Sequence, residues 1–273
     1  LSSLASHPTK ARRRFIASTP PPSTRVNAMR DDLLDAQAAV DWTVAQFPSL
    51  SVRVEIWLAE NMEMVIKDQP APATYNVIVA IPKEPLPRAF NVEIGAYINT
   101  IRSGLDILAT VIANRYGIAR PEDAYFPVAK SGAAFASGNY KGSKFVKALP
   151  PAECAIIEAL TPYKGGNDLL WLLHDLDIMR KHRRLLGFGI NPERFHLIGT
   201  DVRYNFAPVA SGGLRVDDQE TILGMIAKGA PHYDMKIASY VTIYETGFAP
   251  KPVVATLNEF ASLATAIIKL FDR

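Results

Sequence analysis

Titratable side chains gather in one apolar stretch, residues 167–186, which reads NDLLWLLHDLDIMRKHRRLL. Leucine, tryptophan, isoleucine and methionine recur there at helical spacing on several sides, which predicts a helix surrounded by other elements. Two rows of titratable groups run between the apolar rows. They are His174, Asp177, Lys181 and Arg184 on one side and Asp175 and His182 on another. An imidazole beside a carboxylate and an ammonium group can transfer a proton or hold an anion.

A second polar row lies on the helix expected over residues 91–116, where Asn99, Arg102 and Asp106 are spaced i, i+3, i+7. Arg102 and Asp106 can pair at i, i+4. Because charges are costly to bury unpaired on a mostly apolar helix, we expect them to meet each other or charges on a neighbouring helix. The candidate partners there are Asp175, Asp177 and Lys181. The two rows together give the candidate catalytic residues. They are Arg102, Asp106, His174, Asp177, Lys181 and His182.

Two classes of function fit these residues. In the first, which we favour, the protein is a non-enzymatic binding or scaffold protein whose arginine, aspartate, histidine and lysine side chains form a satisfied interhelical network. In the second, the protein is a metal-independent acid–base or phosphoryl-transfer enzyme. There, His182 or His174 moves a proton, Asp177 or Asp106 orients it, and Arg102, Lys181 or Arg183 stabilises an anion.

Other kinds of site lack their sequence patterns. The chain has no HExxH motif and no cysteine pair, and His174 and His182 lie eight positions apart, so we predict no metal site. A G-x-S-x-G nucleophile motif is also absent. The run from Gly138 to Lys144 has three residues between its glycines and then Ser-Lys, which does not match a phosphate-binding loop. We therefore predict no cofactor.

Composition favours a globular protein with a sizeable core, since 48% of the 273 residues are hydrophobic. The net charge of +3 is uneven, because residues 1–25 carry five basic groups and no acid, whereas the rest carries 25 basic and 27 acidic groups. The basic groups Lys10, Arg12, Arg13 and Arg14 suggest RNA or an acidic partner.

The sequence contains a single cysteine, no long apolar window and no hydrophobic signal core, which predicts a cytoplasmic protein without membrane contact. A homo-oligomer is compatible with the sequence.

The order of apolar periodicities predicts an irregular arm over residues 1–25 and one α+β domain over 26–273. The domain is expected to be a bundle of three to four core helices with an N-terminal β-hairpin and a small C-terminal antiparallel sheet. The predicted helices are 26–47, a short one after Pro48, then 91–116, 151–160, 167–186 and 252–271. The predicted strands are 62–67, 75–81, 185–190, 195–206, 214–216 and 235–245.

Two further segments show no clear helix or strand pattern. Residues 118–150 are expected to be largely loop, because glycine, serine and alanine are frequent there. Residues 221–227 fit either a strand or a helical turn.

Five ordered blocks carry a resemblance to a known family. They are IRSGLD (101–106), FP (126–127), LTPY (160–163), LWLLHDL (170–176) and KHR (181–183). The chain resembles, over residues 26–272, a family of uncharacterised bacterial proteins with the signature LRSALDHLA, FP, LQPY and LWLLHEL followed by DKHR. Ile107 stands where that signature has histidine, and Arg180 where it has aspartate. The resemblance implies a shared fold and no particular activity.

A more distant resemblance is to HEPN helical bundles, many of which act as RNases in defence systems. The active motif of those bundles places an arginine four to six residues before a histidine. None of His174, His182, His196 or His232 has an arginine at that distance. The nuclease interpretation therefore depends on the expected bundle and on a site rich in arginine and histidine.

Overall fold

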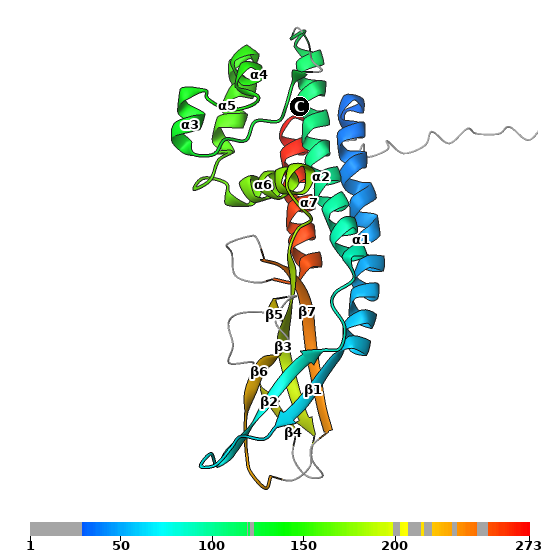
Figure 1. The fold of residues 1–273 in the computed structure, drawn as a ribbon. Coiled ribbons are helices and arrows are strands. Elements are labelled where there is room, and N and C mark those ends of the chain that lie inside the picture. The colour runs from blue at the N-terminus through cyan, green and yellow to red at the C-terminus, as the bar shows by residue number, and fades with distance from the viewer. Residues whose placement is uncertain are drawn as a thin grey trace, which may run out of the picture.

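The computed structural model describes residues 29–118, 120, 123–198, 203–206, 214–215, 220–230, 234–244 and 251–273. The described residues form seven α-helices and two small antiparallel sheets, so the predicted α+β class is confirmed. The helices form one end of an elongated molecule and the sheets the other (Figure 1). The predicted arm, residues 1–25, lies outside the described residues.

Three long helices lie side by side at the helical end (Figure 1). They are α1 (Leu34–Asn61), α2 (Arg88–Arg115) and α7 (Val253–Leu270). Each presents an apolar row at helical spacing, and fully buried side chains such as Leu50, Ile98 and Phe260 fill the space between them. Burial of these rows supplies most of the free energy that holds the helices together.

One of these three helices, α7, is the one described helix that is long and apolar enough to cross a membrane by length and composition. It begins after Pro252, as the sequence predicts, because proline suits the start of a helix. Its buried side chains include Leu257, Phe260 and Ile267. These face α1 and α2 in the core.

Helix α1 corrects the prediction of a break at Pro48. The helix runs without interruption from Leu34 to Asn61 and contains Pro48. Proline removes one backbone hydrogen bond from a helix, but it does not prevent helical dihedrals. Phe47, Leu50 and Val54 are buried on both sides of the proline, so packing of the apolar row outweighs the local cost.

The first sheet contains the antiparallel pair β1 (Met62–Lys67) and β2 (Tyr75–Pro82), in which Met62 lies opposite Pro82 and Lys67 opposite Val77. Strand β6 (Thr221–Ala227) pairs with the other edge of β2, so residues 221–227 are a strand and not a helical turn. In the second sheet, β3 (Phe188–Ile198) pairs with β4 (Arg203–Phe206), β5 (Leu214–Arg215) and β7 (Asp234–Ile243).

Strand β3 corrects a second prediction. Asn191-Pro192 was expected to separate two strands, but it lies within β3, where the register with β7 shifts between Pro192 and Arg194. Proline lacks a donor for the strand ladder, and such an irregularity is where a strand tolerates it.

Residues 118–150 are not largely loop, because they contain α3 (Gly132–Ser137) and α4 (Ser143–Ala148) before α5 (Pro151–Ala159). The side chain of Ser131 caps α3 by accepting a hydrogen bond from the backbone nitrogen of Ala134, at 3.2 Å. Gly138 ends α3 and Gly142 precedes α4, both with positive φ angles that favour glycine. Short capped helices give little periodic signal, so they were missed.

Helix α6 (Asp168–His182) leans against α2 and leads through a short link into β3 (Figure 1). Its bounds correct the predicted 167–186, since the last four residues continue outside the helix. The side chain of Asn91 on α2 donates a hydrogen bond to the carbonyl oxygen of Leu186 at 2.8 Å. This bond fixes the link to the helical end of the molecule.

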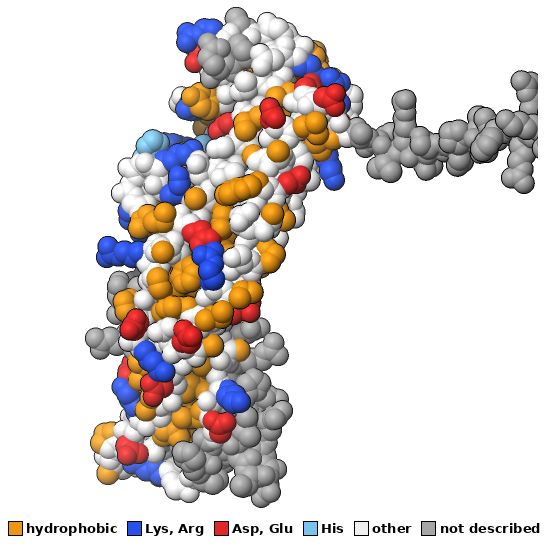
Figure 2. Space-filling view, turned by 90° about the vertical axis from the view of Figure 1, so that its right-hand side faces the viewer, with side chains coloured by type: hydrophobic (Ala, Val, Ile, Leu, Met, Phe, Trp, Pro, Cys, Tyr) orange, Lys and Arg blue, Asp and Glu red, His pale blue; other side chains and the backbone are white. Residues whose placement is uncertain are grey.

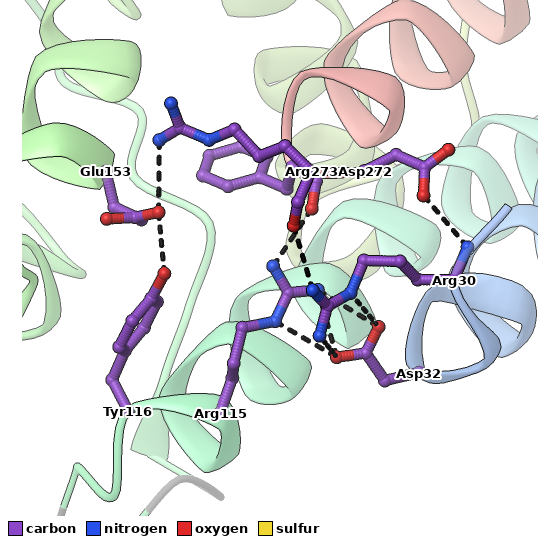
Figure 3. A network of polar contacts seen from close by, with 8 residues as sticks. Arg30, Asp32, Arg115, Tyr116, Glu153, Asp272 and Arg273 are labelled. Atoms are coloured by element: carbon purple, nitrogen blue, oxygen red, sulfur yellow. Dashed lines mark hydrogen bonds and ion pairs between the residues drawn. The ribbon is translucent and has the colours of Figure 1, made fainter.

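A network of ion pairs and hydrogen bonds joins the residues just before α1, the end of α2, the start of α5 and the residues after α7 (Figure 3). We call it the terminal clamp. Its members are Arg30, Asp32, Arg115, Tyr116, Glu153, Asp272 and Arg273. Asp32 receives hydrogen bonds from Arg30 and from both Nε and Nη2 of Arg115, the latter two at 3.0 Å. The buried Glu153 receives one from Tyr116 at 2.6 Å and one from Arg273 at 3.0 Å.

The outer face of α1 and α2 carries exposed hydrophobic side chains between charged ones (Figure 2). Trp42, Val52 and Ile56 on α1 and Val92 on α2 are each more than half exposed. Scattered exposed apolar side chains are common on folded proteins, and these lie away from the polar residues between α2 and α6.

Candidate functional site

The polar rows predicted on two helices meet where α6 packs against α2. Asn167 caps α6, since its side-chain oxygen accepts a hydrogen bond from the backbone nitrogen of Leu170 at 3.0 Å. The cationic residues Arg180, Lys181 and His182 occupy the last turn, where the helix dipole favours positive charge. The cap and the buried leucines of α6 set the rotation that turns His174 and Asp177 toward α2.

Arg102 is the centre of this contact. It is 3% exposed, and it donates hydrogen bonds to three different groups. Its Nη1 bonds the carboxylate of Asp106 at 2.7 Å, its Nη2 bonds the carbonyl oxygen of Phe126 at 2.9 Å, and its Nε bonds Nδ1 of His174 at 3.3 Å. A buried guanidinium is costly unless it is paired, and all three of its nitrogen atoms have partners here.

Asp106 joins the network to the loop before α3. The same carboxylate oxygen that pairs with Arg102 also accepts a hydrogen bond from the backbone nitrogen of Phe126 at 3.0 Å. Arg102 and Asp106 therefore bind the carbonyl and the amide of one residue, Phe126. Its ring is 1% exposed, so the polar contacts and the apolar packing hold this loop at the same point.

His174 is held in one tautomer by Arg102. A guanidinium can only donate, so Nδ1 of His174 must accept, and the proton of the neutral ring is on Nε2. Burial, followed by the positive charges of Arg102, Lys181 and Lys141, lowers the pKa of His174 to about 3. The imidazole is therefore neutral at physiological pH.

A second polar group lies one helical turn along the same contact. The side-chain amide of Asn99 donates to Asp177 at 3.0 Å, and Lys181 forms an ion pair with the other oxygen of Asp177 at 2.7 Å. Asp177 is 4% exposed, whereas Lys181 lies at the surface. The buried carboxylate is thus neutralised by an exposed ammonium group.

The structure brings together five of the six predicted site residues and leaves one apart. Arg102, Asp106, His174, Asp177 and Lys181 line the contact between α2 and α6. His182 is exposed on the last turn of α6 and takes part in none of these hydrogen bonds. The reason is geometric, since His182 lies on a different side of the helix from His174.

A pocket of about 510 Å³ opens beside His174. Its walls carry the cationic side chains of Lys130, Lys141 and Arg183 and the aromatic rings of Tyr140 and Trp171. Asp175 is the one carboxylate among the described lining residues, and Arg102 is not part of the wall. Sequence reasoning missed this pocket because the loop before α4, which supplies Tyr140 and Lys141, is positioned by long-range packing.

No group of three or more potential metal-ligating side chains occurs within the described part of the chain. The basic groups Lys10, Arg12, Arg13 and Arg14, predicted to contact RNA or an acidic partner, fall outside that part. Comparison of the chain with models of protein families, with curated proteins and with solved structures gives no match. The two family resemblances stay predictions.

Proposed function

We propose that the protein is a non-enzymatic binding protein, in which the Arg102-centred network is a structural support and not a catalytic centre. The observation that carries this proposal is the state of Arg102, whose three nitrogen atoms are occupied by Asp106, Phe126 and His174 at a buried position. A group that stabilises a transition state needs donors directed at the reacting atoms. Arg102 directs its donors at the protein itself.

The protonation state of His174 favours the same interpretation. A general acid or base works best when its pKa lies near the working pH. Burial and the neighbouring cations lower the pKa of His174 to about 3. The ring is therefore a weak base that stays uncharged at neutral pH. Its remaining capacity is to donate one hydrogen bond from Nε2.

In this proposal α1, α2, α6 and α7 act as a core bundle, and the β1–β2 hairpin and the C-terminal sheet are appended to it. The network fixes α6 and the loop at Phe126 on α2, so that the surface they form keeps one shape. Preorganised surfaces bind with a smaller loss of conformational entropy.

The enzymatic alternative is favoured by one observation, the cationic pocket directly beside His174. Phosphoryl-transfer sites use such charges to stabilise phosphate oxygens. Phosphatase, nuclease or phosphodiesterase activity that disappears in His174→Gln, at an unchanged melting temperature, would favour this alternative over the binding protein.

The proposal is tested by Arg102→Met, which keeps much of the volume of the side chain and removes its charge. We expect the free energy of unfolding to fall by about 3–5 kcal/mol, because Asp106 and the carbonyl of Phe126 lose their buried partner. Urea unfolding followed by circular dichroism measures the change. His182→Ala is the matched control, and it should change the free energy by less than about 0.5 kcal/mol, since the side chain is exposed. Native-like stability of Arg102→Met would contradict the proposal.

A further inference from the structure

We propose that the pocket beside His174 binds a small anion with a planar aromatic body, of the chemical class of a nucleoside monophosphate. The inference rests on the proposed binding function and assigns a ligand class to it. Its ground is that positive charge, the N–H donor of His174 and aromatic side chains meet in one concave site.

The positive charge of the pocket is compensated only in part. Lys130, Lys141 and Arg183 line it against one carboxylate, Asp175. Among the described residues neither Lys130 nor Arg183 has a carboxylate within ion-pair distance. Lys141 is held differently, since its Nζ lies 3.4 Å from the centre of the Tyr125 ring. An aromatic ring carries no net charge, so this contact does not neutralise Lys141 as a carboxylate would.

His174, which lines the pocket, adds an N–H donor to this charge. Because Nδ1 accepts from Arg102, the ring offers N–H at Nε2 and no free lone pair on its other nitrogen. A neutral donor suits an anionic oxygen and would not suit a bound cation. The side-chain amide of Asn139, also in the wall, provides further donors.

The apolar part of the wall indicates what the anion is attached to. Trp171 is half-buried, and Tyr140 is stacked on Phe135 with ring centres 5.0 Å apart, which fixes its orientation. Val128 and Ile178 complete this side of the pocket. Aromatic and aliphatic walls favour contact with the face of a planar aromatic ring, and a volume of about 510 Å³ lies in the range of small-molecule sites.

Charge distribution favours a small molecule over a polynucleotide. Nucleic acids need a basic track that follows several phosphates. Residues 26–273 carry 25 basic and 27 acidic groups, so the excess of positive charge at the pocket is local. A single phosphate or carboxylate matches that local excess.

Isothermal titration calorimetry with the four ribonucleoside monophosphates tests the ligand class. We expect at least one of them to bind with a dissociation constant below about 1 mM. Inorganic phosphate and the corresponding free nucleoside should each bind at least about tenfold more weakly, because each lacks one half of the contacts. Absence of binding by all four nucleotides would overturn the inference, and so would equal affinity for phosphate alone. Tighter, steeply salt-dependent binding of a single-stranded oligonucleotide would also overturn it.

Variants locate the binding event. Arg183→Gln should weaken nucleotide binding by about tenfold or more, because a charged hydrogen-bond donor is lost from the wall. Arg88→Gln removes an exposed arginine outside the pocket and should leave the affinity unchanged. Equal effects of the two substitutions, or no effect of Arg183→Gln, would place any binding elsewhere and overturn the assignment.

Nuclear magnetic resonance of His174 supplies an independent readout. A bound anion offsets the positive charges that surround the imidazole, so its titration should move to higher pH when the nucleotide is present. An unchanged titration at saturating nucleotide would contradict binding at this pocket. Failure of these experiments leaves the unfolding test of Arg102→Met unaffected, whereas native-like stability of that variant removes the proposed function itself.

Discussion

A single hydrogen bond from Arg102 determines the tautomer of His174. A guanidinium group has only donors and no lone pair to offer. It therefore forces Nδ1 of His174 to be an acceptor, and protonation of that nitrogen would break the bond at 3.3 Å. Burial is the largest cause of the lowered pKa of His174, and the charge of Arg102 adds to it, so the imidazole keeps its neutral form well below the pH at which an exposed histidine becomes charged.

The pH dependence of stability should report this depressed pKa. The pKa of His174 is about 3 in the folded protein and close to 6.5 in the unfolded chain. Between these values the unfolded state binds more protons, so stability is lost as pH falls from 6.5 toward 3, by up to about 1.4 kcal/mol per pH unit. His174→Gln keeps an acceptor for Arg102 and should flatten this dependence in urea titrations from pH 7 to pH 4. Parallel curves for the variant and the native protein would contradict the prediction.

The residues of the network could be predicted because helical spacing is visible in a sequence. Arg102 with Asp106, and His174 with Asp177, each share a helix side, and buried charges need partners. The role of Phe126 could not be predicted, because its contribution is a backbone amide and carbonyl presented by a loop. Contacts made by backbone atoms do not depend on the type of residue, so the sequence does not reveal them. The pocket wall around Lys141 was missed because long-range packing positions the loop that supplies it.

At the scale of elements, α1 and α2 approach each other closely at Gly104. A β-carbon at this position would lie 3.1 Å from the carbonyl oxygen of Ala36 and 3.2 Å from a methyl group of Val40. Both neighbours belong to α1, and one of them is backbone that cannot move without moving the helix. Glycine therefore sets the separation of the two helices at this turn.

Gly104→Leu should separate the helices and destabilise the fold. We expect a loss of about 1–3 kcal/mol or more in the free energy of unfolding, because the added side chain overpacks a close contact. Leucine is preferred to alanine for this test, since either residue regains up to about 1 kcal/mol of helix propensity over glycine, and only the larger side chain overpacks the contact by more than that gain. Ala38→Leu on the exposed side of α1 is the control, with an expected change within about 0.5 kcal/mol. Equal melting temperatures of the two variants would show that the contact at Gly104 does not limit how closely α1 and α2 pack.

Long helices in which apolar residues recur at regular spacing were predicted well. Short elements whose ends are set by one or two capping residues were not. Helices α2 and α7 were located to within a few residues because 28 and 18 positions repeat one pattern. The six-residue helices α3 and α4 are defined by a serine cap and two glycines with positive φ. Pro48 and Pro192 were given too much weight, since packing of α1 and a strand irregularity in β3 accommodate them.

At the scale of the whole molecule, the polar network holds the helix that precedes the second sheet. Helix α6 leads through a short link into β3, and the bond from Asn91 to the carbonyl of Leu186 fixes this link at 2.8 Å. The Arg102 network holds the other side of the same helix. Loss of the network should therefore affect how the two ends of the molecule are joined, as well as the pocket beside His174.

The terminal clamp has a consequence for the order of events in folding. Arg30 and Asp272 are 242 positions apart, and Asp32 and Arg115 are 83 apart, so their contacts close some of the largest loops in the chain and should form after the helices have docked. Asp32→Asn should then accelerate unfolding and leave the folding rate nearly unchanged in stopped-flow experiments. A slower folding rate would place the clamp in the transition state. Otherwise these ion pairs govern the lifetime of the native state and have little influence on the time needed to reach it.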